Sequence, residues 1–184
     1  KNTEFGIVEM GANHPGEIAA LCEIAEPDFG LITNIGTAHI EGFGSFEGVI
    51  KTKSEMYRFL EKSGGTIFLN SDNEILKNQT TYSELAKYGT DCNNFTSGKF
   101  ISANPLLKVL FYDKNSEFEI NTNLFGNYNF ENVLAAVCVG QYFRVENQKI
   151  KSAIENYFPK NNRSQIQITN SNTLLLDMYN ANPT

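Results

Sequence analysis

Three side chains with complementary chemistry follow or adjoin short apolar segments. Glu9 ends one apolar run, His39 follows a second in a glycine-containing loop, and Lys53 lies near the apolar side of a helical pattern. A carboxylate and an imidazole can together hold a divalent ion. Oxygen ligands favour Mg²⁺, and the imidazole adds some preference for Mn²⁺. A lysine among apolar residues loses its proton more readily, and a neutral amine can add CO₂ to become an anionic carbamate.

Each of these residues also has a simpler structural explanation. Glu9 could cap the helix that begins near Gly16, or it could form an ion pair with Lys53. His39 could be a local hydrogen-bonding residue of its loop. The spacing of the residues does not match a zinc site. The residues alone leave these alternatives open.

A second group of polar residues lies in the last third of the chain. Asn129 and Asn132 are three residues apart at the start of an apolar helical pattern, so they share a face. An amide offers a donor and an acceptor, which matches the edge of an adenine, although either residue could instead cap the helix. Arg163 is either a surface charge or a phosphate contact, and Asp177 ends the last apolar run. The sequence contains neither of the two common glycine-rich phosphate-binding motifs, GxxxxGK(S/T) and GxGxxG.

The composition restricts the classes of ligand. The 184 residues include 15 Lys and Arg against 21 Asp and Glu, a net charge of −6, and 41% of the residues are hydrophobic. An acidic chain is a poor binder of nucleic acid or of an anionic membrane surface, so an anionic ligand must be met by a metal, a helix N-terminus or a few placed cations. No apolar run approaches the roughly 20 residues of a membrane span, and no signal peptide is visible. The three cysteines lack metal or redox spacing, which predicts thiols in a reducing compartment.

The order of the predicted elements indicates an α/β fold. Alternation of strands and helices favours right-handed βαβ units and a mostly parallel sheet flanked by helices. Ligands of such sheets bind beyond the carboxyl ends of the strands, where Glu9, His39 and Asp177 are expected. A change of pattern predicts a small antiparallel β element inserted at about residues 95–124. The predicted strands are 5–10, 29–35, 66–70, 165–168 and 173–177, the predicted hairpin turns at 113–115, and the predicted helices are 16–26, 46–60, 74–87, 129–143 and 145–157.

Six motifs, taken in order, resemble the central domain of the Mur ligase family. They are Glu9–Ile18 (EMGANHPGEI), Thr33–Ser45 (TNIGTAHIEGFGS), Lys53–Glu55 (KSE), Gly126–Asn132 (GNYNFEN), Arg163–Gln165 (RSQ) and Asp177–Pro183 (DMYNANP). The first and last resemble the branch that joins D-alanyl-D-alanine to UDP-N-acetylmuramoyl-tripeptide. The resemblance implies that residues 1–184 are a P-loop NTPase-like ATP-binding domain whose P-loop segment would precede Lys1. Amino-terminal and carboxy-terminal domains of the same chain would complete the protein.

The resemblance also implies roles for individual residues. Glu9, His39 and a carbamylated Lys53 match the family's Mg²⁺ ligands, with Mn²⁺ as a possible substitute, and Lys53 and His39 count as catalytic. Asn129 and Asn132 match the asparagines at the nucleotide site. Arg163 and Asp177 complete that site by the same resemblance. One departure is Leu176, which stands where the family has a first aspartate.

The implied reaction is an ATP-dependent ligation through an acyl phosphate, in the cytoplasmic synthesis of peptidoglycan precursors for cell wall, cell shape and cell division. The substrates would be ATP, UDP-N-acetylmuramoyl-tripeptide and D-alanyl-D-alanine, with no nucleic-acid or membrane partner. The segment alone is expected to be inactive. Two alternatives are a sister Mur or folylpolyglutamate-type ligase, which would share the metal residues, and a non-catalytic nucleotide-binding or scaffold module of the same fold.

Overall fold

The structure is a computed structural model that describes residues 3–37, 40–113, 116–160 and 165–176. Its contacts divide the chain into two compact units. Among the described residues, unit 1 comprises 3–37, 40–67 and 75–85, and unit 2 comprises 68–74, 86–113, 116–160 and 165–176. Within the described residues, no helix has both the length and the apolar character needed to cross a bilayer.

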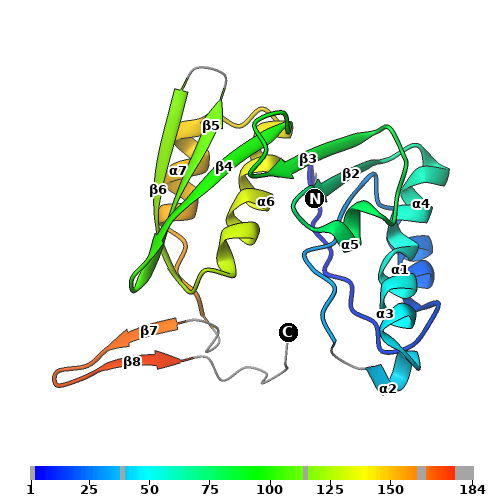
Figure 1. The fold of residues 1–184 in the computed structure, drawn as a ribbon, viewed down its shortest axis with the longest axis horizontal. Helices are drawn as coiled ribbons and strands as arrows, with labels where there is room; N and C mark the ends of the chain where they lie inside the picture. Colours follow the sequence, from blue (N-terminus) through cyan, green and yellow to red (C-terminus); the bar gives the residue numbers. More distant parts are fainter. Residues whose placement is uncertain (1–2, 38–39, 114–115, 161–164, 177–184) are drawn as a thin grey trace. The chain divides into compact units, whose positions relative to one another are not determined.

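A six-stranded sheet has the strand order β1-β2-β3-β4-β5-β6 (Figure 1). Three helices lie between β1 and β2 along the chain. β3 pairs with β4 in parallel, while β4, β5 and β6 pair antiparallel. The predicted fold class, a sheet with parallel strands flanked by helices and with an antiparallel β element, is confirmed. The strands are β1 Phe29–Leu31, β2 Thr66–Asn70, β3 Leu85–Gly89, β4 Thr96–Ala103, β5 Leu106–Asp113 and β6 Ser116–Phe125, and β7 Gln165–Ile168 pairs with β8 Thr173–Leu176 in a separate two-stranded sheet.

The helices of unit 1 pack on one another and on the start of the sheet. α1 contacts α3 and α4, and α4 contacts β1. α1 begins after Gly16, whose φ of 87° is a conformation that favours glycine. The bounds of these helices are α1 Glu17–Ala25, α2 Ile40–Phe43, α3 Phe46–Lys53, α4 Glu55–Ser63 and α5 Glu74–Lys77.

The single helix predicted over residues 46–60 is wrong, because the structure divides it at Ser54 into α3 and α4. The buried hydroxyl of Ser54 donates to the backbone oxygen of Ile50 at 2.7 Å, a local bond that often bends a helix. The spacing of Val49 and Leu60 still places both side chains in the core of unit 1.

The strand predicted over residues 5–10 is also wrong. No strand includes the described residues of this segment, and the side chains of Phe5, Ile7 and Val8 are 65%, 96% and 65% exposed. The apolar pattern shows that the segment suits a sheet. A strand forms, however, only where a neighbouring strand pairs with its backbone.

The helix predicted over residues 74–87 is wrong beyond its first turn. α5 ends at Lys77, and the later residues form β3. Ala86 and Tyr88 are buried while Lys87 between them is exposed, which is the alternation of a strand. Pairing within the sheet therefore overrode the helical spacing in the sequence.

In unit 2, two helices cover the antiparallel strands (Figure 1). α6, Asn129–Tyr142, contacts β4 and β5, and α7, Asn147–Glu155, contacts β6. The apolar face of α6 buries Val133, Leu134 and Val137 against these strands. Both predicted helices and the predicted hairpin between β5 and β6 are confirmed, with ends shifted by a few residues.

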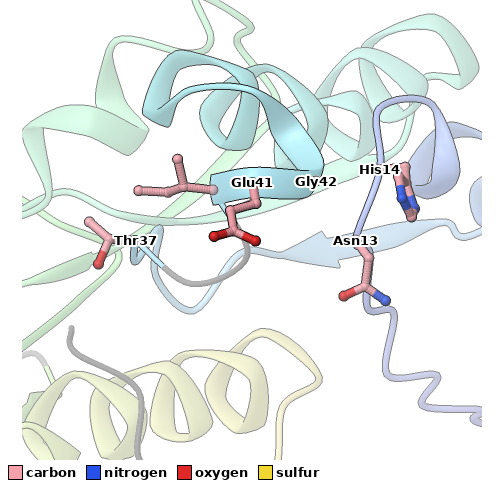
Figure 2. Close-up of a pocket in the computed structure, with 6 residues that line it drawn as sticks. Asn13, His14, Thr37, Glu41 and Gly42 are labelled. Atoms are coloured by element: carbon pink, nitrogen blue, oxygen red, sulfur yellow. The ribbon is translucent and has the colours of Figure 1, made fainter.

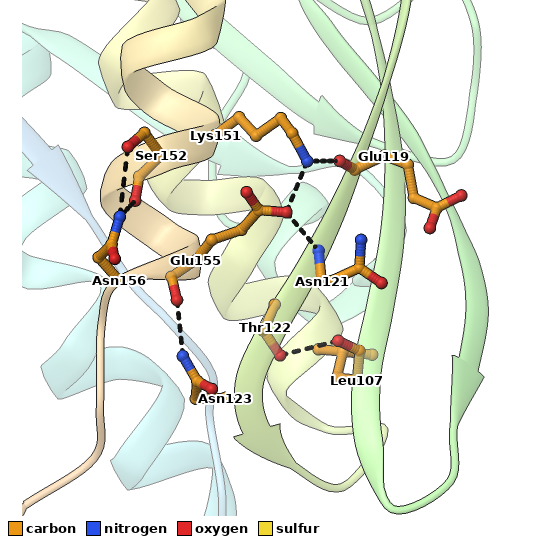
Figure 3. A network of polar contacts seen from close by, with 9 residues as sticks. All are labelled: Leu107, Glu119, Asn121, Thr122, Asn123, Lys151, Ser152, Glu155 and Asn156. Carbon is orange, nitrogen blue, oxygen red and sulfur yellow. Dashed lines mark hydrogen bonds and ion pairs between the residues drawn. The ribbon is translucent and has the colours of Figure 1, made fainter.

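A polar network ties α7 to β6 (Figure 3). The Glu155 carboxylate accepts the backbone N–H of Asn121 at 2.9 Å and the Lys151 ammonium at 2.5 Å. Lys151 also donates to the backbone oxygen of Glu119, and Asn123 donates to the backbone oxygen of Glu155 at 2.6 Å. Partial desolvation alone would raise the pKa of Glu155, but these donors outweigh it and lower that pKa. The network fixes α7 on the outer strand of unit 2.

Candidate functional site

Lys53 reaches from the last turn of α3 to the segment that follows β1. Its ammonium donates to the backbone oxygen of Asn34 at 3.0 Å. The side chain is half-buried, and burial lowers the pKa of the ammonium because desolvation disfavours the charged form. The expected partial burial of Lys53 is therefore confirmed. A lysine in this state has a larger neutral fraction than an exposed lysine, and a neutral amine is the form that reacts with CO₂.

Glu9 lies in the extended segment before α1 and is exposed. The next residue, Met10, contacts the buried Cys22 of α1, with 3.9 Å between the two sulfur atoms. No hydrogen bond or ion pair in the part of the chain that the structure describes engages the Glu9 carboxylate. The suggested Glu9–Lys53 ion pair is therefore absent from that part of the chain.

Two other carboxylates hold the loop between Glu9 and α1. Glu17 accepts the backbone N–H of Asn13 at 2.6 Å and that of His14 at 3.0 Å. Glu55, at the start of α4, accepts the backbone N–H of Gly16 at 3.0 Å and that of Ala19 at 2.9 Å. Glu55, and not Glu9, therefore caps the start of α1, as favoured for an anion at a helix N-terminus.

A pocket of about 490 Å³ lies beside this loop in unit 1 (Figure 2). Its lining residues are Asn13, His14, Thr37, Ile40, Glu41 and Gly42. Figure 2 shows the Glu41 carboxylate projecting from α2 into the space between Thr37 and Asn13. The motifs contain these residues, but nothing in their spacing singled them out as the wall of a cavity. Thr37 and Ile40 flank His39 in the sequence.

The donors named for a metal site fit the ion in chemistry. Glu9 and a Lys53 carbamate would offer the oxygen ligands that Mg²⁺ prefers, and half-burial of the amine favours the neutral form needed for the carbamate. Within the described residues, however, no group of three His, Cys, Asp or Glu side chains is placed to hold a metal ion. Ligation by Glu9, His39 and Lys53 therefore stays a prediction.

In unit 2, the two asparagines of α6 are joined to each other. The Asn132 amide donates to the side-chain oxygen of Asn129 at 3.1 Å, and the Asn129 amide donates to the backbone oxygen of Phe125 at 2.8 Å. Asn129 is 8% exposed, whereas Asn132 is exposed. Asn129 is not the helix cap, a position that Tyr128 occupies. Asn129 therefore holds the Asn132 amide, and no described residue donates a hydrogen bond to the side-chain oxygen of Asn132.

A carboxylate next to Asn132 is linked to the end of β2. The buried Asn70 amide donates to Glu131 at 3.0 Å, and the side-chain oxygen of Asn70 accepts the backbone N–H of Asp72 at 3.0 Å. Burial, and then the negative charge of Asp72, raises the pKa of Glu131. The hydrogen bond from Asn70 opposes this rise. β2 and α6 are thus joined within unit 2 beside the asparagine pair.

Three of the residues named from the sequence lie outside the described residues: His39, Arg163 and Asp177. The structure therefore brings together Asn129 and Asn132, and it brings Lys53 next to Asn34. Glu17 and Glu55 were missed as loop-organising residues. Their signal is weak, because a carboxylate shortly after a turn or a serine is common in any helix-rich protein.

The motifs and the fold agree with comparisons to known proteins. The family model described as Mur ligase middle domain matches residues 1–140. The chain belongs to the Mur ligase family. It is 31% identical over 179 residues to the UDP-N-acetylmuramoyl-tripeptide–D-alanyl-D-alanine ligase of Haemophilus influenzae, with 97% of this chain covered. It is 32% identical over 186 residues to the enzyme of the same name from Bacillus subtilis, with 100% of this chain covered.

Solved structures of Mur ligases share the fold. A crystal structure of MurF from Acinetobacter baumannii superposes with a TM-score of 0.81 at 23% identity, covering 94% of this chain and 38% of that chain. MurF from Thermotoga maritima in complex with ADP gives a TM-score of 0.77 at 23% identity, covering 92% of this chain and 40% of that chain. The chain spans 39% and 40% of the two curated Mur ligases compared above.

Proposed function

We propose that the chain is the ATP-binding part of a ligase that joins D-alanyl-D-alanine to UDP-N-acetylmuramoyl-tripeptide in the cytoplasm. The observation that carries the proposal is the match, over nearly the whole chain, to curated ligases that bear this name. A solved relative with ADP bound supports a nucleotide as one ligand. Because the chain spans less than half of these relatives, the activity is proposed for the longer protein, and the segment alone is expected to be inactive.

The proposed reaction has two steps. An oxygen of the tripeptide carboxylate attacks the γ-phosphorus of ATP, the bond to the β-phosphate oxygen breaks, and ADP leaves. The amine nitrogen of D-alanyl-D-alanine then attacks the acyl carbon, and inorganic phosphate leaves with the former carboxylate oxygen. Of the two protons that the ammonium loses in forming the amide, one leaves on the phosphate and one enters solution.

Named residues of this chain would serve the two steps. Glu9, His39 and the Lys53 carbamate would hold Mg²⁺, which supplies positive charge beside the phosphoryl oxygens. In unit 2, Asn132 would contact the adenine, and Asn129 would keep the Asn132 amide in position. Arg163 and Asp177 are proposed for the same nucleotide.

The decisive experiment measures ADP formation by the full-length protein while each substrate is left out in turn. We expect ADP formation to require both the tripeptide substrate and D-alanyl-D-alanine, with the ligated product seen by mass spectrometry. A sister ligase would instead require a single amino acid or glutamate, and a non-catalytic module would form no ADP with any substrate.

Glu9→Gln tests the role of the metal-binding residues in the same assay. We expect the rate of ADP formation to fall at least about 100-fold, because even residues that only support metal ligands are worth about 10–100-fold. Glu4→Gln is a matched control, since Glu4 is another exposed glutamate of the same segment. A near-normal rate for Glu9→Gln would remove Glu9 from the mechanism.

A further inference from the structure

The pocket beside α2 contains one carboxylate that nothing else in the described structure uses. No hydrogen bond or ion pair within the described part of the chain engages the Glu41 side chain. The other ionisable group of the wall, His14, faces Glu17, with 3.3 Å between ring nitrogen and carboxylate oxygen. The pocket therefore offers an open negative charge, and neither lysine nor arginine lines it.

The walls of this pocket are held from both sides. A Cβ atom added to Gly42 of α2 would lie 2.2 Å from the backbone oxygen of Asn13, so helix and loop touch where any larger residue would force them apart. Glu17 and Glu55 hold the loop through four backbone N–H groups. A carboxylate between walls fixed in this way binds a ligand with little ordering cost.

We propose that this pocket binds the primary ammonium group of the acceptor substrate, with Glu41 as its counter-charge. The inference rests on the proposed function, which makes that acceptor a dipeptide with a free amino terminus. An α-amino group has a pKa of about 7.7–8.0 and is mostly protonated at neutral pH. The carboxylate of Glu41 and the side-chain oxygen of Asn13 are acceptors that suit such a group.

Other ligand classes fit the pocket less well. A phosphate or carboxylate group would meet Glu41 with no lysine or arginine in the wall to balance it. A divalent cation needs several oxygen ligands, and the lining residues contribute a single carboxylate, that of Glu41. An ammonium group needs only one counter-charge and a few neutral acceptors. The negative charge of Glu41 therefore favours the ammonium end of the acceptor over an anionic group.

The test compares Glu41→Gln with the wild type in the full-length protein, by kinetics and by direct binding of D-alanyl-D-alanine in NMR titration. We expect the KM and the Kd for the dipeptide to rise about tenfold or more, because the variant keeps a neutral acceptor but loses the counter-charge of the ammonium group. The KM for ATP should stay within about twofold. Glu41→Asp, which keeps the charge, should retain more affinity for the dipeptide than Glu41→Gln.

Two controls separate charge recognition from structural damage. Glu47→Gln removes another exposed carboxylate, from the first turn of α3, and should leave the dipeptide affinity unchanged. A dipeptide analogue that lacks the amino group should bind the wild type and Glu41→Gln equally. Unchanged dipeptide affinity in a folded Glu41→Gln protein would overturn the inference, as would an equal loss of affinity for ATP and for both dipeptides.

Failure of the proposed function has a different signature. If the wild type forms no ADP with the dipeptide but binds it in a Glu41-dependent way, the result contradicts the ligase assignment and supports the ammonium site. If the wild type is an active ligase whose affinity for the dipeptide does not depend on Glu41, the result contradicts the ammonium site and supports the ligase assignment.

Discussion

The candidate residues of the two units differ in how far the chain itself positions them. In unit 2, Asn129 is buried on a long packed helix and bonds both to Asn132 and to the end of β6. In unit 1, Glu9 is exposed on a segment without regular structure, and Lys53 makes a single hydrogen bond within the described residues, to the backbone oxygen of Asn34. The fold therefore holds the Asn132 amide in place, whereas the Glu9 carboxylate has no such partner among the described residues.

This difference follows from the kind of structure that carries each group. Side chains on α6 are positioned by the apolar packing of this helix against β4 and β5. That packing is cooperative and needs no ligand. In unit 1, Glu9 has no polar contact among the described residues, and the position of Lys53 depends on one hydrogen bond, which is worth only about 1 kcal/mol net. Carboxylates meant for a cation also repel one another until the cation is present.

The largest effect is expected at Lys53, where the comparison depends on a single side chain. Lys53→Ala should lower the rate of ADP formation at least about 100-fold, because it removes the proposed carbamate. Lys51→Ala, two residues away on the exposed side of α3, should stay near the wild-type rate. A small carboxylic acid added to the assay should restore part of the Lys53→Ala rate. A normal rate for Lys53→Ala would show that unit 1 contains no such ligand.

The asparagine pair of unit 2 should separate affinity from stability. Asn132→Ala should raise the KM for ATP about 5- to 10-fold with little change in unfolding free energy, because it removes only a ligand contact. Asn129→Ala should lower the free energy of unfolding by about 1–2 kcal/mol, because the Phe125 carbonyl loses its donor. Chemical denaturation and ATP titration measure the two quantities. Equal effects on ATP affinity without any loss of stability would mean that both amides contact the nucleotide.

A substitution at Glu55 tests whether unit 1 also contains a polar side chain that stabilises the fold, as Asn129 does in unit 2. Glu55→Gln keeps the acceptor oxygen but removes the charge that caps α1, so the free energy of unfolding should fall by about 1 kcal/mol. Glu23→Gln, on the exposed side of α1, is the control. If the two variants are equally stable in chemical denaturation, the loop before α1 is held by contacts other than this cap.

The smallest effect concerns Glu17 and pH. Hydrogen bonds from the backbone N–H groups of Asn13 and His14 lower the pKa of this carboxylate below its ordinary value of 4.5. A lowered pKa means that the contact is present above pH 4.5 and is lost as the pH falls through the lower folded-state value. The NMR amide signals of Asn13 and His14 should therefore shift with a midpoint below 4.5, and Glu17→Gln should abolish the step. A midpoint at or above 4.5 would contradict the contact.

The sequence patterns predicted the fold best where apolar residues are dense. The spacing of Val133, Leu134 and Val137 predicted α6, and the alternation around residues 113–115 predicted the hairpin of β5 and β6. The patterns failed where tertiary packing decided whether a segment joined the sheet. Residues 85–89 joined the sheet although their spacing suited a helix, and residues 5–10 stayed outside it although their composition suited a strand.

The amino-acid sequence alone determined the family of the chain, the α/β class and the candidate residues, because residue type and order along the chain are sufficient to recognise motifs and periodicity. Only the tertiary structure showed that Asn129 holds Asn132, that Lys53 is half-buried against Asn34, and that Glu41 stands open in a pocket. These are properties of groups far apart or differently solvated in space. Burial and hydrogen bonding depend on the neighbours that folding supplies, which no local pattern contains.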